Sequence, residues 1–131
     1  MTTTGWAQDL ADAPPIGQLL VESAGAGPGR IAAQALADEE TLLAHDGVRA
    51  ALVDKQDGRM VAHWERLMGR IYTLGLDEAQ RVFLSFVLSM VGIGQVSLRA
   101  VELLDERRLL IMQRAIVRLA GNDRIAVGTR L

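Results

Sequence analysis

The residues best suited to chemistry in this chain are its two histidines, His45 and His63. An imidazole can bind a transition metal or exchange a proton near neutral pH. A metal site on one helix needs a second ligand at HxxxH, HxxE or ExxH spacing, and neither histidine has one. We therefore predict that His45 lies at a helix end, that His63 lies on the polar side of a helix, and that the chain binds no metal and no cofactor.

The other sequence patterns typical of enzymes are not found either. No serine stands in a GxSxG motif, and there is no cysteine to act as a nucleophile. The glycine-rich segment GAGPGR, residues 25–30, fits no phosphate-binding pattern, and its proline lacks an amide donor. We assign no catalytic residue. If the chain is nevertheless an enzyme or a ligand-binding protein, His63, Trp64 and Tyr72 are the natural lining of its pocket.

Three arginines, Arg107, Arg114 and Arg118, form the clearest charged group. At 100° per residue they lie within about 40° of one another on a helix. Residues 1–58 carry nine acids and three bases, whereas residues 59–131 carry seven acids and eleven bases. This asymmetry favours self-complementary association or an anionic partner. The arginines are predicted to contact an acidic protein, with nucleic-acid phosphates as a second candidate and a solvated helix face as the alternative.

The segment VFLSFVLSMV, residues 82–91, contains only two polar residues. Asp77 and Gln80 form a capping-box pattern, which predicts a helix over residues 78–91. A helix that is apolar nearly all round is buried nearly all round, and a chain of this length has few other helices to surround it. We therefore predict a homo-oligomer, whose interface includes Phe83, Phe86, Val87 and Met90.

The remaining elements are predicted from hydrophobic periodicity and composition. Apolar residues recur every three or four positions over residues 60–74, which indicates an amphipathic helix ended by Gly75. The other expected elements are a helix over residues 30–44, in which residues 38–40 could instead start a second helix over residues 41–45, and a turn over residues 54–58. A further helix is expected over residues 98–120, with a break near Leu104-Asp105 and a stop at Gly121, followed by a short strand or extended tail over residues 125–127.

The chain has 131 residues, half of them apolar, which predicts a single domain with its own core. Because Leu and Ala dominate, we expect an all-α fold, a small bundle of about 4–5 helices over residues 30–131, with a short extended C-terminus. The sequences APPIG and GAGPG mark residues 1–29 as a flexible or partner-held arm, within which residues 16–23 could form a short helix. No signal peptide, membrane span or cysteine is evident, which favours a cytoplasmic location.

Together these features favour a non-enzymatic α-helical interaction or assembly protein that self-associates through helix 78–91. The alternative is a small DNA-binding regulator. Residues 84–104 fit a helix-turn-helix with Gly92 in the turn, followed by an Arg-rich helix. The sequence pI of about 5.6 does not support this alternative, because DNA-binding domains usually carry a net positive charge.

Overall fold

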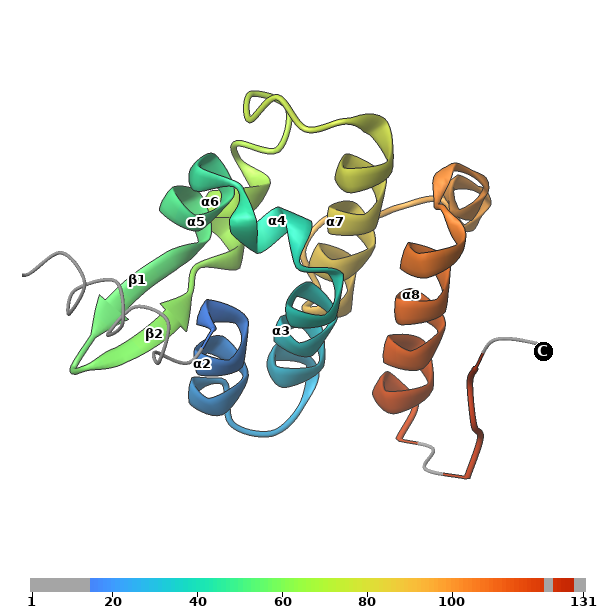
Figure 1. The fold of residues 1–131 in the computed structure, drawn as a ribbon, viewed down its shortest axis with the longest axis horizontal. Helices are drawn as coiled ribbons and strands as arrows, with labels where there is room; N and C mark the ends of the chain where they lie inside the picture. The colour runs from blue at the N-terminus through green and yellow to red at the C-terminus, as the bar shows by residue number, and fades with distance from the viewer. Residues whose placement is uncertain (1–14, 122–123, 129–131) are drawn as a thin grey trace, which may run out of the picture.

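The computed structural model describes residues 15–121 and 124–128, which are mostly helical and include a two-stranded sheet (Figure 1). The predicted helical character is confirmed, but the fold is not purely α. In chain order the elements are α2 (Ile16–Ser23), α3 (Pro28–Glu39), α4 (Thr41–Ala44), α5 (Asp46–Leu52), β1 (Val53–Gln56), β2 (Arg59–Ala62), α6 (Trp64–Met68), α7 (Glu78–Met90), the 3-10 helix η1 (Leu98–Leu103) and α8 (Glu106–Leu119).

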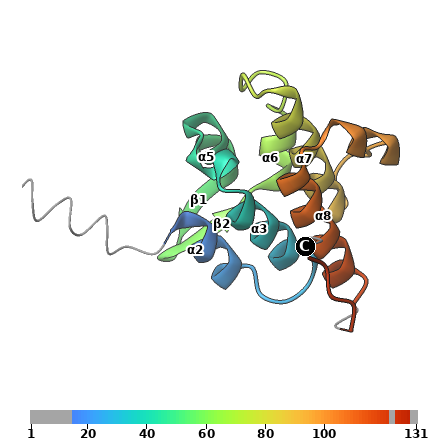
Figure 2. The same cartoon turned by 45° about the vertical axis from the view of Figure 1, so that its right-hand side comes forward.

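Helix α3 lies at the centre of the molecule, with α2 on one side and α7 and α8 on the other (Figures 1 and 2). Its buried face is rich in alanine, and these small side chains let the neighbouring helices approach closely. A Cβ atom added at Gly17 of α2 would lie only 2.7 Å from the Cβ atom of Ala37. The largest fully buried side chains come from most of the elements: Leu20, Leu36, Leu42, Leu52, Leu67, Phe83, Leu84, Leu88 and Met112.

Helix α2 occupies part of the segment that the sequence marks as an arm. The short helix expected over residues 16–23 is present. Leu20 and Val21 are buried, and α2 packs against α3 and β2. Ser23 Oγ donates hydrogen bonds to the carbonyl oxygens of Leu20 and Met60, which ties the end of α2 to β2. This part of the segment therefore belongs to the core, and residues 1–14 lie outside the described residues.

The β-hairpin is the main departure from the expected all-α fold. Strands β1 and β2 pair antiparallel, with Val53 opposite Ala62. Asp57 and Gly58 connect the strands with positive φ angles of 51° and 80°. Two such angles match the right-handed twist of a hairpin, and Asp-Gly is a favoured pair for this turn. The turn predicted over residues 54–58 is correctly placed but too wide, because its first residues belong to β1.

The prediction of one helix over residues 60–74 is wrong for most of that range. Its first residues belong to β2, and α6 is only five residues long. The apolar residues that suggested the helix are nevertheless core residues, since Leu67, Ile71 and Leu74 are buried. Here α6 and the turns after it bury one or two side chains each, whereas the apolar side chains of β2 are only partly buried, and together these positions imitate helical spacing. Gly75 adopts the expected left-handed conformation with φ 71°.

Helix α7 confirms the prediction for the apolar segment, because it spans Glu78–Met90. The Asp77 carboxylate accepts a hydrogen bond from the Gln80 backbone N–H at 2.8 Å. In return, the Gln80 side-chain oxygen accepts a hydrogen bond from the Asp77 N–H at 3.1 Å. This reciprocal pair is the capping box that the sequence predicts, and it satisfies two amide donors at the start of the helix.

The C-terminal region breaks where the sequence indicates, between η1 and α8. Gly121 has φ 74°, and its N–H donates to the carbonyl of Arg118, so α8 also stops as predicted. The described residues 124–128 run back beside α8 without forming a strand (Figure 1). A helix-turn-helix needs a second α-helix to enter the major groove. Because η1 is a 3-10 helix of six residues, the arrangement predicted over residues 84–104 lacks that helix.

Candidate functional site

The four residues predicted to form an oligomer interface lie on α7, and the chain itself covers most of their surface. Phe83 and Val87 are fully buried, Phe86 is buried, and Met90 is half-buried against the core. Helices α3, α6, η1 and α8 all pack against α7. The apolar face of α7 is therefore part of this chain's own core. Sequence reasoning underestimated how many elements of the same chain surround this helix.

The predicted arginine group meets the acidic C-terminal end of α3 in the same chain. Arg107 donates hydrogen bonds to the carbonyl oxygens of Glu39 and Asp38 at 2.9 and 2.8 Å. Arg118 Nη1 lies 4.0 Å from the Asp38 carboxylate. Cations are favourable here because the unpaired carbonyl groups at a helix C-terminus carry partial negative charge. The charges of these two arginines are thus engaged, at least in part, within the chain.

A buried ion pair adjoins this contact and was not predicted. The Glu39 side chain is 0% exposed and the Arg108 side chain 14% exposed, and Arg108 Nη2 lies 2.8 Å from the Glu39 carboxylate. The Thr41 hydroxyl and the Leu42 backbone N–H also donate to this carboxylate. Burial alone would lower the pKa of Arg108, but the hydrogen bond and charge of Glu39 raise it above its usual value. The pair fixes α3 to α8.

Helix α8 is apolar on two opposite faces. Its inner face is buried and includes Ile111, Met112 and Ala115. At 100° per residue six residues of α8 lie within about 120° of one another on the opposite side, and the exposed Glu106, the first residue of the helix, is one of them. None of the apolar residues among them is fully buried in the described part of the chain, since Leu109, Leu110 and Val117 are half-buried and Ile116 is exposed. We call the five residues of this arc that follow Glu106 the outer face of α8, namely Leu109, Leu110, Gln113, Ile116 and Val117.

The described C-terminal segment lies beside this outer face and leaves a groove. Arg114, the third predicted arginine, donates from Nε to the carbonyl oxygen of Val127 at 3.1 Å and holds the segment against α8. Ile116 is 46% exposed and Ile125 is 57% exposed, so two branched apolar side chains remain open to solvent here. The groove has a volume of about 410 Å³ and is lined by Gln113, Ile116, Val117, Ala126, Val127 and Gly128.

His45 has the helix-end role that the sequence predicts. Its Nδ1 accepts hydrogen bonds from the backbone N–H groups of Gly47 and Val48 at 3.1 and 3.2 Å, so the imidazole caps the N-terminus of α5. This use of Nδ1 requires the tautomer with its proton on Nε2. Within residues 15–121 and 124–128, no three side chains of His, Cys, Asp or Glu are grouped as a metal ion would require.

His63 lies at the base of the hairpin, just before α6, and forms part of a small polar cluster. Its Nε2 lies 2.9 Å from the Asp54 carboxylate, and Arg66 binds both oxygens of Asp54 at 3.0 Å. The hydrogen bond from Arg66 is the main cause of the lowered pKa of Asp54. Burial acts in the opposite direction and raises this pKa, but the charges of Arg66 and His63 lower it further. The cluster ties β1 to α6.

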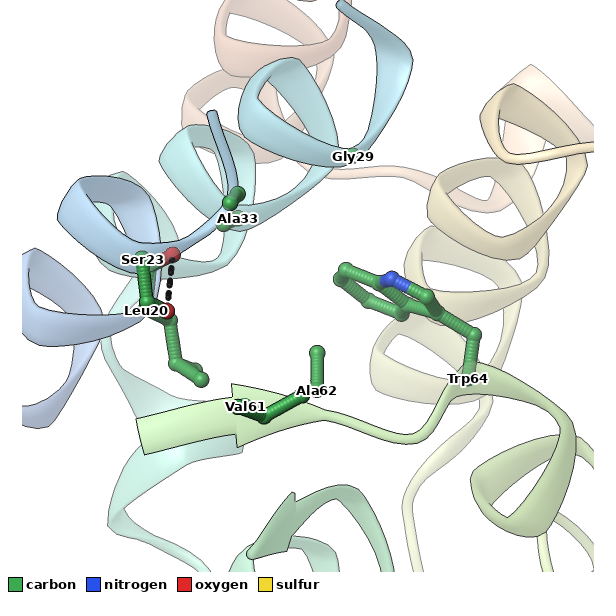
Figure 3. Close-up of a pocket in the computed structure, with 8 residues that line it drawn as sticks. Leu20, Ser23, Gly29, Ala33, Val61, Ala62 and Trp64 are labelled. Atoms are coloured by element: carbon green, nitrogen blue, oxygen red, sulfur yellow. Dashed lines mark hydrogen bonds between the residues drawn. The ribbon is translucent and has the colours of Figure 1, made fainter. Parts of the chain in front are cut away.

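Trp64 lines a pocket of about 240 Å³ between β2 and the connection from α2 to α3 (Figure 3). Its indole ring projects from the start of α6 across this pocket toward Leu20 and Ser23 (Figure 3). Sequence reasoning named Trp64 together with His63 and Tyr72 as a natural lining. Of these three, Trp64 alone lines this pocket, because His63 pairs with Asp54 and Tyr72 is exposed beside the Arg81 guanidinium.

No protein-family model, curated protein or solved structure matches this chain. In the part of the chain that the structure describes, no helix combines the length and apolar character needed to cross a membrane. The outer face of α8 and the Trp64 pocket both present apolar surface that the described residues cover only in part.

Proposed function

We propose that this protein is a non-enzymatic α-helical assembly protein that pairs with a second copy of itself through the outer face of α8. The observation that carries the proposal is the second apolar face of this helix. A helix on the surface of a globular protein normally buries one apolar stripe and exposes polar residues on the other side. Helix α8 instead exposes Ile116 and leaves Leu109, Leu110 and Val117 outside the buried core.

The spacing of the outer face suits a helix–helix contact. Leu109, Gln113 and Ile116 are separated by four and three residues, and Leu110, Gln113 and Val117 by three and four. Side chains at this spacing form a continuous ridge that packs into the groove of a neighbouring helix. The groove between α8 and the C-terminal segment continues this surface. It offers space for an apolar side chain of the neighbour.

A second copy of the chain is the partner that this face fits best. In a twofold dimer each subunit presents the same surface, so the surface must complement itself. Gln113 lies near the middle of α8, and in an antiparallel pair the two copies of Gln113 would meet close to the axis. A carboxamide both donates and accepts hydrogen bonds, so the two side chains would satisfy each other. Apolar residues on each side of Gln113 would then meet apolar residues of the partner.

This proposal keeps the self-association expected from the sequence but places it on a different helix. Helix α7 is covered by its own chain, whereas α8 lies at the edge of the molecule (Figure 1). The DNA-binding alternative has less support. Both terminal nitrogens of Arg107 already donate to the end of α3, and η1 is not an α-helix.

Sedimentation equilibrium tests the proposal on the wild-type chain and two variants. We expect the wild type to have twice the chain mass of 14.2 kDa at micromolar concentration. Ile116→Glu should give a folded monomer, because it buries an unpaired charge in the contact. Leu98→Glu is the matched control, since Leu98 is also exposed but lies on η1. A monomeric wild type, or a dimer that survives Ile116→Glu, would contradict the proposal.

A further inference from the structure

We infer that the pocket beside Trp64 binds a small aromatic molecule that carries a hydrogen-bond acceptor. The pocket lies away from the outer face of α8, and its walls come from α2, α3, β2 and α6 (Figure 3). This inference therefore does not depend on self-association. It rests on the size of the pocket, on the residues opposite the indole ring and on the indole N–H group.

The size of the pocket matches one aromatic ring with a short substituent. Its volume is about 240 Å³. An apolar protein cavity of about 150 Å³ is large enough to bind benzene. The additional space accommodates a group of two or three non-hydrogen atoms. Larger, drug-sized ligands usually occupy pockets of roughly 300–1,000 Å³.

The walls of the pocket leave the indole ring available for stacking. Trp64, the largest lining residue, shares the pocket with Leu20 and Val61, but most of the other lining residues are small, among them Gly29, Ala33 and Ala62, and their short side chains leave space beside the indole. Trp64 is only half-buried although it adjoins the core. An aromatic ring placed against the indole would gain an offset or edge-to-face contact in addition to apolar burial. The pocket therefore favours an aromatic ring over an aliphatic ring of the same size.

The polar groups of the pocket specify an acceptor on the ligand. Trp64 Nε1 is a donor only, and it has no hydrogen-bond partner among the described residues, although it is not sealed from solvent. Ser23 is the other polar side chain in the lining, and its hydroxyl already donates to backbone carbonyl groups. A carbonyl or amide oxygen on the ligand would accept a hydrogen bond from the indole.

The test follows the indole N–H signal of Trp64 by ¹H–¹⁵N NMR while benzamide is added to the full chain. The chain has two tryptophans, so Trp64→Phe assigns the signal. We expect a saturable shift with a dissociation constant on the order of 1 mM, which is typical of a ligand this small. Cyclohexanecarboxamide carries the same acceptor on an aliphatic ring and should bind several-fold more weakly.

Two leucine substitutions locate the binding. Ala62→Leu should abolish the shift, because the Ala62 side chain points into the pocket (Figure 3). Ala50→Leu is the matched control on the exposed side of α5 and should leave the shift unchanged. If Ala62→Leu does not fold, Ala24→Leu at the exposed rim of the pocket replaces it.

Two results would overturn the inference. One is a Trp64 signal that does not move with benzamide up to about 20 mM, well above the expected dissociation constant. The other is a shift of equal size in the pocket-filling variant and the wild type. Equal affinity for benzamide and cyclohexanecarboxamide would refute the preference for an aromatic ring.

Discussion

Replacing Arg108 by methionine is predicted to lower the free energy of unfolding by about 3 kcal/mol. Methionine keeps much of the apolar stem but removes the guanidinium group, which leaves the Glu39 carboxylate fully buried without its cation. Breaking a buried ion pair from one side costs about 3–5 kcal/mol. We take the lower end of this range because the Thr41 hydroxyl and the Leu42 N–H still donate to Glu39, and because Arg108 is partly exposed.

Urea denaturation followed by circular dichroism measures this loss. With a slope of about 2 kcal/mol per molar urea, the unfolding midpoint should fall by roughly 1.5 M. Arg107→Met is the matched control, because this exposed arginine bonds to backbone carbonyls, and its loss should cost about 1 kcal/mol or less. The variant Glu39→Gln/Arg108→Met should be more stable than the sum of the two single changes predicts. Additive effects, or a loss under about 1 kcal/mol for Arg108→Met, would refute the reasoning.

Three further predictions concern the hairpin, α7 and α2. The folded pKa of Asp54 is lowered from 3.8, so its pair with Arg66 stabilises the chain above that pH and loses its effect as the pH falls through the folded pKa. Asp54→Asn should therefore lower Tm at about pH 6 and lose this difference in acid, whereas a constant difference would contradict the assignment. Asp77→Ala should cost about 1 kcal/mol in urea denaturation, and Asp77→Ser should restore most of it. Gly17→Ala should cost about 1–3 kcal/mol, because its Cβ atom would lie 2.7 Å from that of Ala37; unchanged stability would show that α2 is not packed this closely.

Short sequence signals are sufficient to predict those element boundaries that depend on interactions between neighbouring residues. The start of α7 depends on Asp77 and Gln80, which are three residues apart and bond to each other. The stop of α8 depends on the left-handed conformation of Gly121. The hairpin also has a local signal, the Asp57-Gly58 pair. This signal does not lead to a predicted hairpin, because the apolar spacing that begins at Met60 favours a helix over the residues that form β2.

The candidate sites depend on contacts between residues far apart in the sequence, and for this reason only part of them could be predicted. Helix α7 is apolar on nearly all sides and is covered on most of them, as the sequence predicts, but the cover comes from the same chain. Arg107 is predicted from the sequence to contact a separate acidic protein, and the Arg108–Glu39 pair is not predicted at all, because nothing near these arginines in the sequence indicates that α3 ends beside α8. Of the three residues that the sequence suggests as a pocket lining, Trp64 alone lines the pocket described above, and the residues opposite it come from segments distant in the sequence.

The pairing of α8 across a twofold axis is tested most directly by disulfide cross-linking. The chain has no cysteine, so a single introduced cysteine reports on its own position. In an antiparallel pair, Gln113→Cys places the two sulfurs close to the axis, where the Cα atoms come within the roughly 7 Å that a disulfide allows. We predict that mild oxidation converts Gln113→Cys to a covalent dimer and leaves Ala50→Cys monomeric. A Gln113→Cys chain that stays monomeric, or equal cross-linking of both variants, would contradict the proposed interface.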